Sequence, residues 1–154
     1  MEPKIVKRRA VTLVGMVVSG PSVRDIDIGG LWRRFERDHA SIKGAVKGKS
    51  FEVHIEEDMS PRIHFCFIGL EVRRPQDVPA GMFVKTLPAG HYAVFTHTFR
   101  DGGFAAAFRN VYGWLKKSRY TSAHHFDVQC YGKRYQGYDD PRSVIEILVP
   151  VKKK

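Results

Sequence analysis

Two carboxylates stand in apolar, strand-like runs that resemble each other. The first run covers residues 51–54 (FEVH) and the second covers residues 126–129 (FDVQ). A carboxylate in a mostly apolar strand is costly unless it is paired, hydrogen-bonded or placed to meet a ligand. Glu52 and Asp127 are therefore candidate binding residues. Their duplication predicts a pseudo-symmetric fold with an acid-bearing cleft at its centre.

Strand alternation alone does not decide which face of the sheet Glu52 and Asp127 lie on. Neighbouring residues of a strand point to opposite faces, so Glu52 and Asp127 lie on the other face from the phenylalanines that precede them. Both acids would then face either a groove beneath helices or the solvent side of the sheet.

The elements that must position these acids follow from hydrophobic periodicity. The β-branched run at residues 11–18 predicts a mostly buried strand. Apolar side chains at helical spacing predict a helix over residues 28–42. Residues 51–55 and 63–72 then predict two strands around a turn at Asp58-Met59-Ser60-Pro61.

The same order returns in the second half of the chain. Residues 91–98 predict a strand, residues 103–117 a helix, and residues 126–131 and 144–151 two closing strands. Between the halves lies a Pro-containing connector, residues 73–89, which is too short to link separate domains.

We therefore predict one α+β domain over residues 1–154. Repeat one would cover about residues 10–72 and repeat two about residues 90–151, each with the order β-α-β-β. The strands would merge into one antiparallel sheet with both helices on one face and a cleft between the halves.

Composition limits the function classes. The 154 residues include 26 Lys and Arg against 16 Asp and Glu, which gives a net charge of +10. The basic residues are spread along the chain, so a solvated face and a polyanion-binding surface both stay open. No nucleic-acid-binding motif accompanies them, and we expect no sequence-specific DNA binding. No apolar stretch could span a membrane and no signal peptide is present, so we expect a cytoplasmic protein.

Cysteine and histidine residues do not indicate a cofactor. Cys66 and Cys130 stand in apolar runs without CxxC spacing, and we expect both to be reduced and buried. His91 and His97 would share a strand face, but no third ligand follows at zinc-like spacing. There is also no nucleophile elbow, P-loop or dinucleotide fingerprint. We expect neither a metal nor a cofactor.

Aromatic residues could line the predicted cleft. An aromatic cage with one carboxylate suits a flat lipophilic cation, through cation–π contact and charge pairing. Phe35 and Phe108 are expected in the core. The candidate ligand-binding aromatic residues are Trp32, Trp114, Tyr112 and Tyr138.

Three segments resemble a known family. Residues 87–95 (LPAGHYAVF), 111–115 (VYGWL) and 145–151 (IEILVPV) are similar to the gyrase-inhibitor-like small-molecule-binding family. The same module is the effector-binding domain of AraC-type and MerR-type transcription regulators. The resemblance implies the duplicated fold with a ligand cleft between its halves, and ligands that are hydrophobic and often cationic.

The resemblance also assigns a role to one acid. In the second repeat of the family, the acid of a phenylalanine-acid-x-tyrosine strand helps bind the ligand, and by position that acid is Asp127. This chain departs from the pattern, with Asp where Glu is usual and Gln129 where tyrosine is usual. Glu52 of the first repeat could carry part of the role.

Our leading prediction is a free-standing member that binds a hydrophobic, cationic or planar small molecule, for drug sensing or sequestration. Two alternatives follow from the resemblance. One is hydrolysis of reactive cyclopropane-type compounds by a cleft carboxylate, Asp127 or Glu52, acting on water. The other is a gyrase-inhibitor-like interaction with a protein partner, either gyrase or a regulator. The oligomeric state is not predicted.

Overall fold

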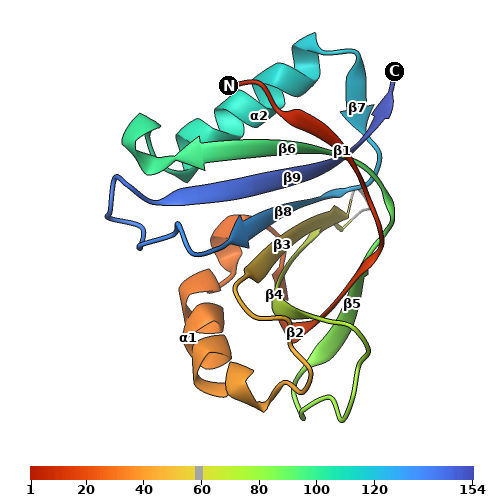
Figure 1. The fold of residues 1–154 in the computed structure, drawn as a ribbon, viewed down its shortest axis with the longest axis vertical. Helices are drawn as coiled ribbons and strands as arrows, with labels where there is room; N and C mark the ends of the chain where they lie inside the picture. The colour runs from red at the N-terminus through yellow and green to blue at the C-terminus, as the bar shows by residue number, and fades with distance from the viewer. Residues whose placement is uncertain (58–60) are drawn as a thin grey trace.

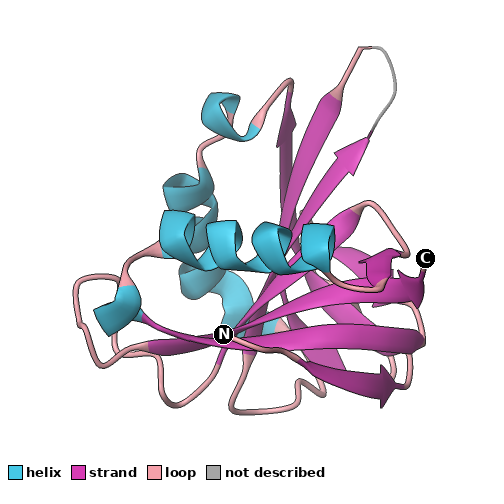
Figure 2. Ribbon diagram, turned by 90° about the horizontal axis from the view of Figure 1, so that it is seen from above, coloured by secondary structure: helices cyan, strands magenta, loops and turns pink. Residues whose placement is uncertain are grey.

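Within residues 1–57 and 61–154, which this computed structural model describes, nine strands form a strongly curled antiparallel sheet and two α-helices lie on one of its faces (Figures 1 and 2). The strands are β1 (Lys4–Arg8), β2 (Val11–Gly20), β3 (Ser50–Glu57), β4 (Ile63–Val72), β5 (Phe83–Leu87), β6 (Gly90–Thr98), β7 (Tyr120–Ser122), β8 (Phe126–Tyr131) and β9 (Val144–Lys153). The helices are α1 (Ile28–Asp38) and α2 (Phe104–Lys117).

The strands of the two repeats are arranged symmetrically about the middle of the sheet. It runs β1-β6-β9-β8-β3-β4-β2-β5, with β7 paired to β9, so the two halves meet at β3 and β8. Val53 pairs with Val128 at this junction, as expected for a twofold axis between equivalent residues. The outermost strands are exchanged, since β1 pairs with β6 and β5 pairs with β2. The strand that precedes repeat one, β1, therefore lies at the edge of repeat two. The strand that precedes repeat two, β5, lies at the edge of repeat one.

The predicted fold class is confirmed, with three strands added. The duplicated β-α-β-β order, the antiparallel sheet and the two helices on one face are all present. Sequence patterning did not indicate β1, β5 or β7. The strand β1 reads KIVKR and is largely exposed, so it lacks the apolar period of a buried strand, while β5 lies inside the predicted connector, residues 73–89.

Two boundaries differ from the prediction. The helix α1 ends at Asp38, and a 3₁₀ turn (His39–Ser41) carries the chain on to Ile42. The predicted turn at Asp58-Met59-Ser60-Pro61 falls almost entirely outside the described residues. The N-terminus of α1 is fixed by Asp27, whose Oδ1 accepts a hydrogen bond from the Gly30 amide at 2.9 Å.

Alternation along the strands divides the apolar residues between two sides of the sheet. Phe51, Val53 and Val128 face the inside of the curl, in a core built from both halves. The other side packs against the apolar stripes of the helices, with Phe35 of α1 and Val111 of α2 fully buried. The prediction that Phe35 belongs to the core is confirmed.

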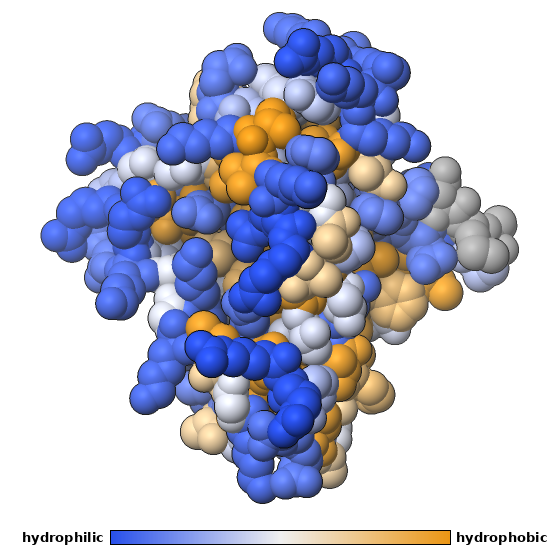
Figure 3. Space-filling view, turned by 45° about the vertical axis from the view of Figure 1, so that its right-hand side comes forward, coloured by the Kyte–Doolittle hydropathy of each residue, from blue (hydrophilic) through white to orange (hydrophobic). Residues whose placement is uncertain are grey.

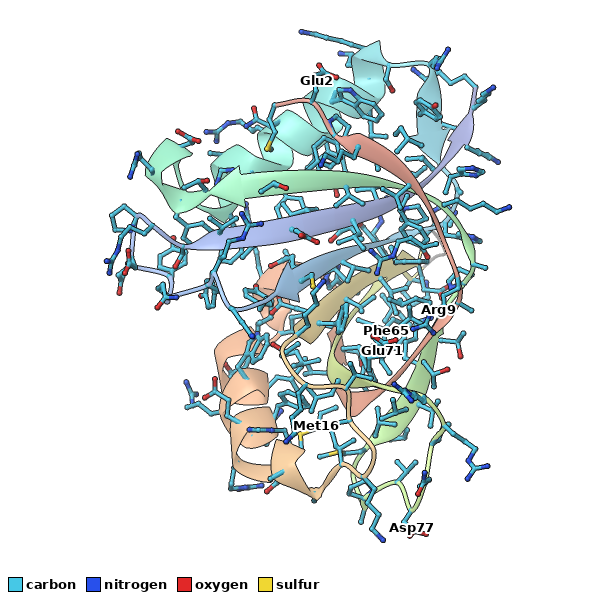
Figure 4. All side chains as sticks on the ribbon, viewed as in Figure 1. Glu2, Arg9, Met16, Phe65, Glu71 and Asp77 are labelled. Carbon is cyan, nitrogen blue, oxygen red and sulfur yellow. The ribbon has the colours of Figure 1, made fainter. Side chains whose placement is uncertain are left out.

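Charged side chains cover much of the surface. Figure 3 shows hydrophilic groups spread over the whole of one face, with smaller apolar areas between them. Arg9, which follows β1, forms an ion pair of 3.0 Å with Glu71 of β4, and the two are labelled in Figure 4. Cys66 and Cys130 are both buried and free, as expected. No helix among the described residues is long and apolar enough to cross a bilayer.

Two glycines let β2 and β4 approach closely. Gly15 pairs with Gly69, and a Cβ at Gly15 would overlap the carbonyl oxygen of Ile68 and lie 2.5 Å from the Cα of Gly69. Such a site requires glycine because the partner backbone occupies the space of a side chain.

We therefore predict that Gly15→Ala lowers the free energy of unfolding by about 2–3 kcal/mol, because the added methyl group forces the strands apart. Gly113 of α2 is the matched control, since a Cβ there meets nothing within 4 Å. Gly113→Ala should raise stability by up to ~1 kcal/mol through helix propensity. Urea denaturation measures both, and an unchanged midpoint for Gly15→Ala would contradict the close approach.

Candidate functional site

The central strands carry a row of polar residues on the face that the helices cover. Glu52 and His54 of β3 pair with Gln129 and Asp127 of β8, respectively. All four line a cavity of about 1150 Å³ between the sheet and the two helices. The structure thus places Glu52 and Asp127 on the groove side of the sheet and not on its solvent side.

Aromatic side chains from both helices and from the second half of the chain form much of the cavity wall. Tyr138 stacks on Phe104 with ring centroids 5.7 Å apart, and Phe108 stacks on Tyr112 at 6.1 Å. On the opposite side, the edge of Trp32 meets Tyr131 at 5.3 Å. The aromatic lining residues include Trp32, Phe104, Phe108, Tyr112, Tyr131 and Tyr138.

Glu52 is held by several neighbours. Its Oε1 accepts a hydrogen bond from the Trp32 indole nitrogen at 2.7 Å, and its Oε2 lies 3.2 Å from His54 Nε2. The Tyr131 hydroxyl is 3.4 Å from the same Oε2 but only 2.7 Å from Gln129 Oε1. A hydroxyl has one proton to donate, and the shorter bond goes to Gln129. Both oxygens of Glu52 are satisfied within the protein, so its burial at 5% exposure is compensated.

Asp127 has fewer partners. The Tyr112 hydroxyl donates to Oδ2 at 3.3 Å, a long bond. Among the described residues, Oδ1 of Asp127 is the one buried side-chain nitrogen or oxygen atom with no hydrogen-bond partner. Burial raises the pKa of Asp127 to about 6, although the charge of His54 and the Tyr112 hydrogen bond oppose that rise. The charged form of Asp127 is thus only partly compensated within the protein.

His54 connects the two acids. Burial lowers its pKa, but the hydrogen bond and charge of Glu52 together with the charge of Asp127 outweigh burial, and the net direction is upward. On its other side, His54 Nδ1 lies 2.9 Å from His64 Nε2. Burial and the neighbouring His54 lower the pKa of His64.

The structure brings most of the predicted site residues together. Asp127, Glu52, Trp32, Tyr112 and Tyr138 all line the cavity. Tyr112 and Tyr138 lie at its rim, where they are 56% and 61% exposed.

Trp114 does not belong to this group. Its ring packs against Phe95 at 5.6 Å and stacks on Tyr120 at 5.8 Å, and its indole nitrogen donates to Glu2 at 3.0 Å (Glu2 is labelled in Figure 4). It is also absent from the cavity lining among the described residues. Trp114 therefore fixes the N-terminal segment and β7 to α2. Phe108, expected in the core, packs against the core beneath α2 and also lines the cavity.

Sequence reasoning did not name several of the lining residues, among them His54, His64 and Phe104. A signal was present for His54. It follows Glu52 by two residues, so strand alternation puts both on the same face. The approach of His64 depends on the pairing of β4 with β3, which no local pattern reveals.

A curled antiparallel sheet with two helices over an acidic, aromatic cavity defines the class as a small-molecule-binding domain of the effector-binding type. The model of the GyrI-like small molecule binding domain family matches residues 1–152. The chain belongs to this family, and the resemblance noted in the sequence is confirmed.

Three similar proteins illustrate the family and the fold. The transcriptional regulator BrlR of Pseudomonas aeruginosa is 32% identical in an alignment 154 residues long. The alignment covers 98% of this chain and 56% of BrlR, so the chain spans just over half of that relative. The structure of SAV2435 bound to tetraphenylphosphonium matches with a TM-score of 0.75 and 21% identity, covering 99% of this chain and 94% of that one. The C-terminal domain of EcmrR matches at 0.73 and 10% identity, with 99% and 98% covered. At these identities the two structures show the shared fold alone.

The raised pKa of Asp127 has a consequence for stability. The folded state binds more protons than the unfolded state between about pH 4 and pH 6, so stability rises as pH falls through that window and is reduced at pH 7. Asp127→Asn removes the ionised form. We predict a gain of about 1–2 kcal/mol at pH 7 that disappears near pH 4.

Urea denaturation at both pH values measures this difference. The control is the exposed Asp139, where Asp139→Asn should change stability by less than about 0.5 kcal/mol. A loss of stability at pH 7 for Asp127→Asn would show that the carboxylate is compensated after all.

Proposed function

We propose that the protein binds a hydrophobic organic cation with planar rings in its central cavity, for sensing or sequestration. The observation that carries the proposal is the buried Oδ1 of Asp127 that has no hydrogen-bond partner. A cation beside this carboxylate would restore the interaction that burial removes, and the surrounding rings suit its apolar body.

The charge of the lining supports a cationic ligand. Among the described residues, the cavity lining holds four carboxylates, one guanidinium and four imidazoles, and with histidine neutral its formal charge is negative although the whole chain carries +10. The guanidinium, Arg62, lies 3.1 Å from Glu56. The cavity is therefore an acidic site in a basic protein, and it is complementary to cations. The lining carboxylates are Glu36, Glu52, Glu56 and Asp127.

The two central acids would have different roles. Glu52 already accepts from Trp32 and lies beside His54, so it is best suited to hold these two side chains in place. Asp127 has an oxygen without a partner and a raised pKa, which a cationic ligand would lower again. Asp127 is thus the proposed countercharge, in agreement with the role that the family resemblance assigns to it.

Tetraphenylphosphonium, the cation bound in the SAV2435 structure, is a suitable probe because tetraphenylborate has nearly the same shape and the opposite charge. We predict that the protein prefers the phosphonium by at least ~100-fold, since a like charge beside a buried acid costs several kcal/mol. Isothermal titration calorimetry measures both affinities.

The same titration tests the acid directly. Asp127→Asn should weaken phosphonium binding at least ~10-fold, which corresponds to about 1.4 kcal/mol, while Asp139→Asn leaves it unchanged. Equal affinity of wild type and Asp127→Asn would remove Asp127 from the site. Equal affinity for the phosphonium and the borate would show that the charge of the ligand does not determine binding.

The two tryptophans provide a second comparison. Trp32→Phe should weaken phosphonium binding about fivefold, because the smaller ring offers a weaker cation–π contact and no longer donates to Glu52. Trp114→Phe should leave the affinity within a factor of about two, since that residue packs outside the cavity. Circular dichroism of both variants verifies folding, and the opposite order of effects would overturn the placement of the ligand.

A further inference from the structure

Three side chains that can bind a metal ion converge at the cavity, and two of them, Glu52 and His54, line it. Glu52 and His54 share one face of β3, and Cys66 of β4 pairs directly with His54. His54 Nε2 lies 3.2 Å from Glu52 Oε2 and 3.9 Å from Cys66 Sγ. All three ligand atoms lie within 4.8 Å of one another.

These distances are close to those of a tetrahedral zinc site. Zinc lies about 2.0–2.1 Å from nitrogen, 2.0–2.2 Å from oxygen and 2.3 Å from sulfur, so tetrahedral geometry requires separations of about 3.4 Å between N and O and about 3.6 Å between N and S. Shifts of a few tenths of an ångström would bring the N–O and N–S separations to these values. The separation between the Glu52 oxygen and the Cys66 sulfur, which is within 4.8 Å, must close to about 3.6 Å.

The neighbour of His54 provides an independent argument. A histidine that binds a metal through Nε2 usually donates its Nδ1 proton to a second group, which fixes the tautomer and the ring orientation. His54 Nδ1 lies 2.9 Å from His64 Nε2, which can accept that proton. The second partner that such a site needs is therefore in place.

The burial of the cluster also fits a divalent cation. Cys66 is fully buried and Glu52 is 5% exposed. With Glu52 and Cys66 ionised, the two negative charges balance a divalent ion, and a buried neutral cluster avoids the cost of an isolated charge. Thiolate and imidazole ligands favour Zn²⁺ over the oxygen-seeking Mg²⁺ and Ca²⁺.

We propose that Glu52, His54 and Cys66 form a binding site for Zn²⁺ or a similar borderline-soft divalent cation, with the fourth position open to the cavity. On binding, the thiol proton of Cys66 leaves to solvent and the sulfur coordinates the ion. His64 is a positioning residue, since it would act through His54. The ion would lie beside Asp127, which pairs with His54 in β8, so it opposes binding of an organic cation.

Cobalt(II) titration tests the site, because a thiolate ligand gives an intense charge-transfer absorption that oxygen and nitrogen ligands do not give. Wild-type protein should show this band with Co²⁺ alone and lose it on addition of Zn²⁺. Cys66→Ala should abolish the band. Cys130→Ala is the matched control, since Cys130 is also buried and free but lies on the other face of the sheet, in the core within the curl, and it should retain the band.

Two further measurements keep the test decisive if Cys66→Ala does not fold. His64→Ala should weaken Zn²⁺ binding about 10–100-fold while the charge-transfer band persists, as expected for a positioning residue. X-ray absorption of Zn²⁺-loaded wild type should show one sulfur neighbour at about 2.3 Å. A shell of nitrogen and oxygen alone, or the absence of Co²⁺ and Zn²⁺ binding, would overturn the proposal and leave the three groups as a hydrogen-bonded cluster. Neither result depends on whether organic cations bind.

Discussion

The antiparallel pairing of β3 with β8 is the interaction on which the cavity depends. It joins the two halves of the sheet and sets Glu52 opposite Gln129 and His54 opposite Asp127. Because strand alternation has a period of two, a slip of one residue in either strand would change which of these groups meet. The apolar residues between them, including Val53, are buried on the other face of the sheet and hold the register in place. One register thus builds both the core and the polar floor of the site.

Glu52 and Asp127 differ in how far their hydrogen-bonding capacity is satisfied. Equivalent positions in the repeat would lead one to expect equivalent roles, yet Glu52 is surrounded by hydrogen-bond donors and Asp127 retains an oxygen without a partner. The difference arises from what surrounds each acid, with the Trp32 indole beside Glu52 and only the hydroxyl of Tyr112 beside Asp127. Uncompensated burial reduces stability in the free protein, and a cationic ligand would remove this cost.

Sequence reasoning reached the fold class, both helices and six strands, because each has a clear apolar period. It missed β1, which is short and largely exposed, and β5, which lies in a segment that reads as a connector. For the site, strand alternation left two faces open for the acids, and only packing against the helices decides between them. Trp114 illustrates the same limit, since it lies in the helix of the second repeat as Trp32 lies in that of the first, but its ring packs against Tyr120. Contacts between residues of neighbouring strands, such as that of Cys66 with His54, depend on the pairing register, which local sequence patterns do not predict.

The central claim is that a cation in the cavity is neutralised by Asp127. A crystal structure of the complex with tetraphenylphosphonium tests it most directly. We predict that the phosphonium lies between α1 and α2, with phenyl rings against Trp32 and Tyr112 and the Asp127 carboxylate as the nearest anionic group. The claim would be contradicted by a phosphonium bound outside this cavity, or by one that is paired with Glu52 while Asp127 keeps its surroundings unchanged.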